Sequence, residues 1–182
     1  MVAMSSSQRF LTKSRFKIAT ECPTKLFYLD KPEYGNNKTD DSFLKALAEG
    51  GFQVGELAKL YHPGGIEVTD KSHSNTVAKT NELLMANSVI IFEAAFCFEE
   101  FFIRVDVLIK NGNNIELIEV KAKSFDPSED HFFAKRRKKP LITSDWKPYL
   151  LDIAFQTFVI RKAFPKFKIT SFLMLADKSR TA

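Results

Sequence analysis

Two long apolar runs on either side of an Asn-Gly turn constrain the fold of this chain more than any other feature. Residues 104–123 read RVDVLIKNGNNIELIEVKAK, and the turn occupies residues 111–114. An Asn-Gly turn between two apolar runs predicts a β-hairpin, here with strands at about 101–110 and 115–122. Because both runs are almost continuously apolar, we expect the sheet to be covered on both faces.

The register of this hairpin brings charged side chains together. If Lys110 pairs with Ile115 across the turn, Asp106 lies opposite Glu119. Alternation along the strand then puts Lys121 on the same face as Glu119. Two facing carboxylates destabilise a sheet, whereas a divalent cation between them reverses that effect, and carboxylate oxygens suit Mg²⁺ or Mn²⁺. The alternative is a solvated surface pair, but the apolar flanks favour burial, where polar groups need partners.

An Asp followed by Glu-x-Lys on the next strand of a hairpin resembles the PD-(D/E)xK nuclease superfamily, and specifically its RecB-like branch. The resemblance implies that Asp106 and Glu119 hold Mg²⁺ or Mn²⁺, with the backbone carbonyl of Val120 as a further ligand. Lys121 would orient or deprotonate the attacking water, and a pKa lowered by the nearby metal would suit the second role.

The function that the resemblance implies is metal-dependent hydrolysis of DNA phosphodiester bonds. This reaction needs a metal to polarise the phosphate, an activated water, and charge relief at the leaving oxygen. One alternative is a nucleic-acid-binding module that kept the nuclease fold and lost catalysis, which the intact acidic and lysine residues disfavour. Another is a hydrolase that acts on a smaller phosphate ester.

Two further residues enter the site by resemblance. Glu93 lies on the apolar strand before the hairpin, where RecB-like nucleases carry an additional metal-binding Glu. Its alternative is a charge at a strand edge. Gln156 lies on the helix after the Glu-x-Lys strand and matches the Gln of these nucleases, which contacts substrate or orients the lysine. The Tyr that often follows four residues later is replaced by Ile160, and a polar stripe on an amphipathic helix is the alternative.

The segment from Cys22 to Tyr28 is similar to the first half of the iron–sulfur element in RecB-like nucleases of CRISPR adaptation. That element needs three more cysteines, and this chain has only Cys97, in the middle of a predicted strand. We therefore expect no iron–sulfur cluster in this chain and a small buried role for Cys22. In a second family element, Gly55 stands where a metal-binding His often lies; Glu56 is either a substitute for that His or a solvated helix residue, and we favour the second.

A basic segment in the connection after the hairpin is the candidate DNA-binding element. It comprises Lys135, Arg136, Arg137, Lys138 and Lys139. Contact with phosphates and a merely solvated loop are about equally favoured. The adjacent Phe132 and Phe133 could stack on unpaired bases. The net charge of +5 permits a polyanion as partner, while strand preference and oligomeric state stay open.

The hydrophobic pattern predicts the order of elements. Helices are expected at about 14–20, from Cys22 onward, from about 40 to Gly50-Gly51, and at about 52–61, 76–86 and 145–163. Strands are expected at about 66–68, 88–98, 101–110, 115–122 and 167–176. The last two thirds thus follow the αβββαβ order of the nuclease family. We expect an α/β three-layer sandwich with a central mixed sheet and N-terminal helices, as a single domain over residues 1–182. Because the chain ends just after an apolar strand, we leave open that it belongs to a longer protein.

The composition bears on location. Two cysteines give no disulfide framework and suit a reducing compartment. No apolar stretch is long enough for a membrane span, and the polar N-terminus lacks the apolar core of a secretion signal. We therefore expect a cytoplasmic protein with no membrane partner.

Overall fold

The computed structural model describes residues 9–29, 31, 33–34, 42–134 and 141–179. Its helices are α1 (Lys13–Glu21), α2 (Pro23–Tyr28), α3 (Ser42–Leu60), α4 (His73–Leu83) and α5 (Lys147–Ala163). Its strands are β1 (Leu11–Thr12), β2 (Ile66–Glu67), β3 (Ser88–Phe98), β4 (Phe101–Asn111), β5 (Asn114–Phe125) and β6 (Lys168–Asp177). The order from α4 to β6 is the predicted helix, three strands, helix and strand.

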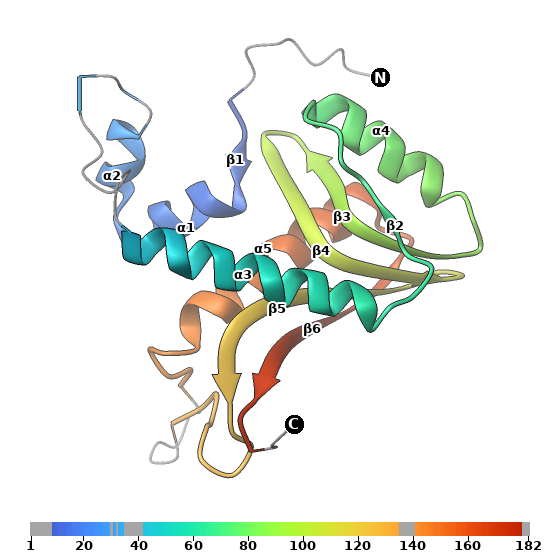
Figure 1. Cartoon of the computed structure of the whole chain (residues 1–182). Coiled ribbons are helices and arrows are strands. Elements are labelled where there is room, and N and C mark those ends of the chain that lie inside the picture. The colour runs from blue at the N-terminus through green and yellow to red at the C-terminus, as the bar shows by residue number, and fades with distance from the viewer. Residues whose placement is uncertain (1–8, 30, 32, 35–41, 135–140, 180–182) are drawn as a thin grey trace.

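The strands form one mixed six-stranded sheet. Its order is β2-β3-β4-β5-β6, with the short β1 beside β4. The hairpin strands are antiparallel, whereas β6 runs parallel to β5 and β2 runs parallel to β3. Helix α5 crosses one face of the sheet and α3 the other (Figure 1). The predicted α/β class with a mixed sheet is therefore confirmed, and helices on both faces are consistent with the three-layer sandwich.

Buried side chains hold the two helical layers to the sheet. The larger cluster joins α5 to the central strands and includes Ala94, Leu108, Leu117, Val159 and Ile160. The smaller cluster lies under α3 and consists of Ala58, Phe92, Val107 and Ile118. Each large apolar side chain that is removed from water in this way contributes about 1.5–3 kcal/mol to stability. The nearly continuous apolar pattern of β4 and β5 thus reflects a sheet that is covered on both faces.

The alternation of side chains between the two faces of the sheet is interrupted at one point along β3 and β4. Phe92 packs into the α3 cluster and Ala94 into the α5 cluster, although residues two apart on a strand should share a face. Val107 and Val105, their partners on β4, divide in the same way. Between them Glu93 has a left-handed φ of 57°, which is uncommon for a residue with a side chain. This left-handed backbone at Glu93 rotates the strand, which explains why Phe92 and Ala94 point to opposite faces of the sheet.

Three predicted boundaries were wrong. Gly50 and Gly51 do not end a helix, since α3 runs through them to Leu60. A glycine inside a helix costs about 1 kcal/mol relative to alanine, and packing of this helix on the sheet outweighs that cost. The actual stop is the turn at residues 61–65, where Gly64 has a φ of 82°.

Helix α4 begins at His73, earlier than predicted, because the Ser72 hydroxyl accepts the amide N–H of Asn75 as an N-cap. The hairpin loop is shorter than predicted, since Asn111 pairs with Asn114 and leaves Gly112, at a φ of 58°, and one further residue in the turn. Within the described residues, no helix is both long enough and apolar enough to cross a membrane.

Candidate functional site

The candidate site lies where β4 and β5 separate. The predicted register is confirmed, with Lys110 opposite Ile115 and Val107 opposite Ile118. Residue-by-residue pairing between β4 and β5 ends at Val107 and Ile118. Asp106, the residue before Val107, is not paired with β5 through its backbone. Its side-chain Oδ2 instead accepts the backbone N–H of Val120 at 2.7 Å. The two strands thus form a fork, and the acidic residues predicted to face each other lie at its opening.

The N-terminal segment closes the other side of this fork. β1 runs parallel to the first residues of β4, with Leu11 opposite Phe101. The side chain of Thr12 then caps α1, which starts at Lys13. This places the Lys13 Nζ 2.7 Å from Glu119 Oε1 and 3.9 Å from Asp106 Oδ1. Sequence reasoning missed Lys13, because no local pattern links it to a strand so distant in the chain.

Glu119 is the centre of the buried part of the site. Its side chain is 0% exposed, and its Oε1 lies 2.5 Å from the Lys121 Nζ, so the two share a face as predicted. Its Oε2 accepts a 2.6 Å hydrogen bond from Gln156 Nε2, which confirms that the helical Gln lies beside the Glu-x-Lys motif.

Asp152 completes the surroundings of Lys121. Its Oδ2 lies 3.4 Å from the Lys121 Nζ, and its side chain is largely buried. We did not predict a role for Asp152. The signal was present, because Asp152 and Gln156 are four residues apart on one helix and must therefore share a face.

The two carboxylates have opposite electrostatic environments. Burial and the neighbouring charge of Glu119 raise the pKa of Asp106 from its ordinary value of 3.8 to about 6. Burial alone would also raise the pKa of Glu119, but the ammonium groups of Lys13 and Lys121 outweigh burial and hold it below its ordinary value. Ionised Asp106 therefore destabilises the folded protein, whereas ionised Glu119 is stabilised by the two ammonium groups beside it.

Glu119 controls the protonation of Lys121 in the protein without bound metal. Burial favours the neutral amine, but the charge of Glu119 outweighs burial, and the pKa of Lys121 is raised. A bound cation would add positive charge beside Lys121 and favour its neutral form, so a deprotonating Lys121 in the metal-loaded protein stays a prediction. A protonated Lys121 can orient a water or balance negative charge.

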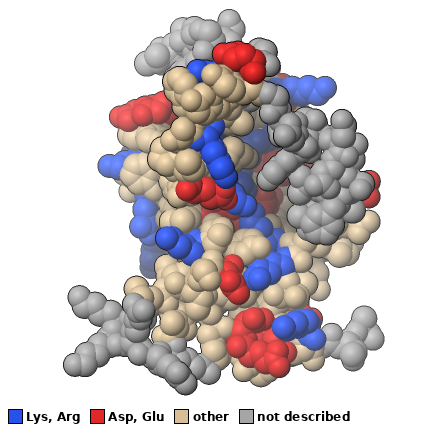
Figure 2. Space-filling view, turned by 90° about the vertical axis from the view of Figure 1, so that its left-hand side faces the viewer, with Lys and Arg blue, Asp and Glu red and all other residues tan. Residues whose placement is uncertain are grey.

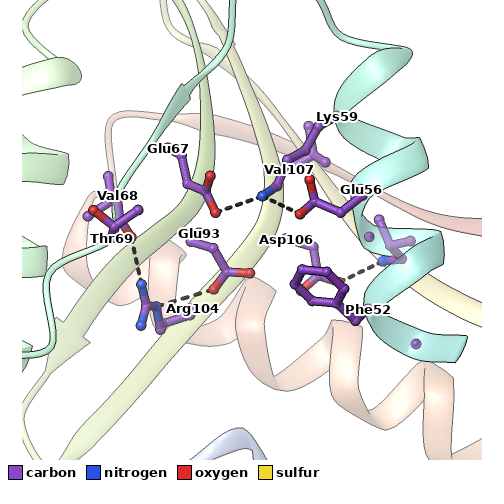
Figure 3. A pocket seen from close by; sticks show the side chains of 13 residues that line it. Phe52, Glu56, Lys59, Glu67, Val68, Thr69, Glu93, Arg104, Asp106 and Val107 are labelled. Atoms are coloured by element: carbon purple, nitrogen blue, oxygen red, sulfur yellow. Dashed lines mark hydrogen bonds and ion pairs between the residues drawn. The ribbon is translucent and has the colours of Figure 1, made fainter. Parts of the chain in front are cut away.

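A cavity of about 420 Å³ lies on the α3 side of the fork, and Glu93, Asp106 and Val120 form part of its wall (Figure 3). Glu93 Oε2 lies 3.3 Å from Arg104 Nε, so Glu93 pairs with a guanidinium in the metal-free protein. Glu56, expected to be solvated, contributes to the same wall and pairs with Lys59 at 2.7 Å.

The donor set of the fork fits a hard divalent cation. Asp106, Glu119 and the Val120 carbonyl are oxygen donors, and Mg²⁺ commonly takes one or two carboxylates and completes its shell with water. Gln156 Oε1 is buried without a hydrogen-bond partner, which leaves an acceptor that water or a cation would satisfy. In the described part of the chain, however, no three His, Cys, Asp or Glu side chains gather as a metal-binding group.

The remaining predicted residues lie away from the fork or outside the described ranges. Residues 135–139, the basic segment, fall outside the described residues. Phe132 stacks on Phe125 with ring centroids 5.5 Å apart, and it therefore contributes to local packing, whereas Phe133 is 51% exposed. Cys22 is half-buried, not fully buried as expected, and it precedes α2 as its N-cap residue.

Comparisons with known proteins gave no match: neither a family model, nor a curated protein, nor a solved structure is significantly similar to this chain.

Proposed function

We propose that this chain is a nuclease that uses Mg²⁺ or Mn²⁺ to hydrolyse DNA phosphodiester bonds. The observation that carries the proposal is the fork between β4 and β5. There, two acidic residues, Asp106 and Glu119, both lie within 3.9 Å of the Lys13 ammonium, the charge of Glu119 raises the pKa of Asp106, and Lys121 contacts Glu119. Carboxylates with a raised pKa beside a second carboxylate are concentrated at functional sites, and Asp106 is such a group, half-buried at the mouth of the fork.

Each residue of the fork has a chemical role in this proposal. Asp106, Glu119 and the Val120 carbonyl would hold the ion, which would polarise the phosphate and activate a bound water. Lys121, held as a cation by Glu119 and by Asp152, orients the attacking water and balances the charge that develops on the phosphate. Gln156 fixes the second oxygen of Glu119 and so keeps the carboxylate in one orientation.

A polyanionic substrate is supported by charge. The chain carries a net charge of +5. Figure 2 shows Lys and Arg side chains running through the middle of one face, with single acidic side chains between them. Residues 135–139 add the densest basic segment of the sequence, and we assign to it contacts with DNA phosphates.

A second candidate function is a nucleic-acid-binding module without catalysis. One observation favours it: the Lys13 ammonium pairs with Glu119 and lies 3.9 Å from Asp106 Oδ1, so a cation of the protein itself occupies the fork without any metal. If this arrangement is permanent, the fork is a structural ion cluster and the protein binds DNA without cutting it.

Cleavage assays separate the two functions. Labelled single-stranded and double-stranded DNA would be incubated with the protein in Mg²⁺, in Mn²⁺ and in EDTA. We expect metal-dependent cleavage by the parent and a loss of ~10²–10⁴-fold in the Lys121→Met variant. The matched control is Lys123→Met, on the same strand, where the ammonium lies over the Trp146 ring and not against Glu119. DNA binding without cleavage under every condition would favour the second candidate.

A further inference from the structure

Lys13 holds a position that a bound cation would also need. Its ammonium is the group that contacts Glu119 Oε1 at 2.7 Å while lying 3.9 Å from Asp106 Oδ1. An ion that bridges these two carboxylates has to contact an oxygen of each. Glu119 Oε1 already contacts both Lys13 and Lys121, and Glu119 Oε2 is held by Gln156. Both oxygens of Glu119 are thus engaged by the protein's own donors, and the nearest cation to Asp106 Oδ1 among these groups is Lys13.

The backbone at Lys13 is fixed, whereas its side chain has a route to solvent. The segment before it pairs with β4, and Phe10 is buried against Phe102. After it, Phe16 stacks on Phe155 of α5 with ring centroids 4.4 Å apart and an interplanar angle of 6°. The Lys13 side chain itself is 26% exposed. Its ammonium can therefore leave Glu119 by rotation of the side chain, without any movement of β1 or α1.

We infer that Lys13 is an internal competitor of the divalent cation: it pairs with Glu119 and lies beside Asp106 in the metal-free protein, and it turns away when the ion binds. This inference rests on the proposed function, because it takes the fork to be a metal site. Lys13 thereby sets the affinity of the fork for the divalent cation. A lysine in this place weakens metal binding, since the ion must displace a charge-assisted hydrogen bond.

The test is a calorimetric titration of the full chain with Mn²⁺, after removal of metal with EDTA. Without the competing ammonium, Lys13→Met should bind Mn²⁺ at least about tenfold more tightly than the parent. Lys13→Arg keeps a cation and should bind no more tightly than the parent. Lys17→Met is the matched control, since it removes the same charge from an exposed position one turn along α1, and its Mn²⁺ affinity should stay within about threefold of the parent.

Thermal unfolding gives a second readout. In EDTA, Lys13→Met should melt at a lower temperature than the parent, because Glu119 loses one of its two ammonium partners. Addition of Mn²⁺ should then raise its melting temperature by more than it raises that of the parent. If Lys13→Met does not fold, Lys13→Gln carries the test, since it keeps a hydrogen-bond donor for Glu119 and removes the charge.

The inference would be overturned if Lys13→Met and Lys13→Gln bound Mn²⁺ as the parent does or more weakly. It would also be overturned if Lys17→Met bound Mn²⁺ as tightly as Lys13→Met. The Asp106→Ala variant distinguishes this failure from failure of the proposed function. If Asp106→Ala removes Mn²⁺ binding and the Lys13 variants bind like the parent, the metal site stands and only the competition is wrong. If Asp106→Ala binds Mn²⁺ like the parent, or if no variant binds Mn²⁺, the proposed metal site is wrong and the inference falls with it.

Discussion

Substitution of Asp106 by Asn should stabilise the metal-free protein at neutral pH. The pKa of Asp106 lies at about 6 in the folded chain, against an ordinary value of 3.8. Each pKa unit corresponds to about 1.4 kcal/mol. The raised pKa of Asp106 therefore corresponds to about 3 kcal/mol of destabilisation of the fold when Asp106 is ionised. Asn removes the charge and keeps an oxygen that can accept the Val120 N–H. Few substitutions in a buried site are expected to stabilise a protein this much.

The pH dependence follows from the direction of this shift. Because the folded pKa lies above the unfolded one, the folded state holds a proton between about pH 4 and pH 6 that the unfolded state has released. The cost of Asp106 is therefore fully present above pH 6 and disappears as the pH falls towards 4. We expect Asp106→Asn to gain about 3 kcal/mol at pH 7.5 and only about 1 kcal/mol at pH 4.5.

The corresponding change at Glu119 should have the opposite sign. Its pKa is lowered, so its ionised form stabilises the fold above its unfolded pKa, and this contribution is lost as the pH falls through the folded pKa. Glu119→Gln leaves the ammonium groups of Lys13 and Lys121 without their shared partner. Removing one member of a buried ion pair typically costs about 3–5 kcal/mol.

Urea unfolding in EDTA, followed by fluorescence of the buried Trp146, would measure both effects. Glu116→Gln is the control, because Glu116 is exposed on the same strand, and its free energy of unfolding should change by less than about 0.5 kcal/mol. A destabilised Asp106→Asn variant, or stabilisation by both Asp106→Asn and Glu119→Gln, would refute this reasoning about the fork.

Three further outcomes are expected. Replacing residues 135–139 by Ser should weaken DNA binding and flatten its salt dependence, while cleavage at saturating DNA persists; an unchanged slope of affinity against salt would make the segment a solvated loop. Lys121→Met should keep Mn²⁺ binding and lose ~10²–10⁴-fold in single-turnover cleavage, and Lys121→Arg should not rescue it because the guanidinium is larger and planar; cleavage near the parent level by Lys121→Met would contradict the assignment. An uncleaved oligonucleotide should tighten Mn²⁺ binding by the parent more than by Lys13→Met, because only in the parent can phosphate also draw the Lys13 ammonium away from Glu119; equal tightening in both proteins, measured by titration, would exclude this role of Lys13.

The hairpin and its charged residues could be predicted from the sequence because they depend on local rules. Turn chemistry set the register, and strand alternation put Glu119 and Lys121 on one face. The position of Gln156 beside Glu119 came from the family resemblance, and the structure shows the hydrogen bond. These inferences need only short stretches of chain and the order of neighbouring elements.

The parts that could not be predicted depend on distant or unusual backbone. Lys13 reaches Glu119 only because β1 pairs with β4, and no periodicity in the sequence announces that contact. Glu93 has a left-handed backbone that rotates the facing of β3, whereas the alternation rule assumes a regular strand. The glycines at 50 and 51 indicated a helix end that tertiary packing of α3 overrides.

The central claim is that Asp106 and Glu119 form a metal site that cleaves DNA, and the most direct measurement is single-turnover cleavage in Mn²⁺ by the parent and by Asp106→Asn. Because this variant should be more stable than the parent without metal, a loss of activity cannot come from unfolding. We predict that Asp106→Asn, folded and melting above the parent in EDTA, binds Mn²⁺ weakly and cleaves DNA at least ~10²-fold more slowly. Cleavage by Asp106→Asn at the rate of the parent, under the same Mn²⁺ concentration, would contradict the account.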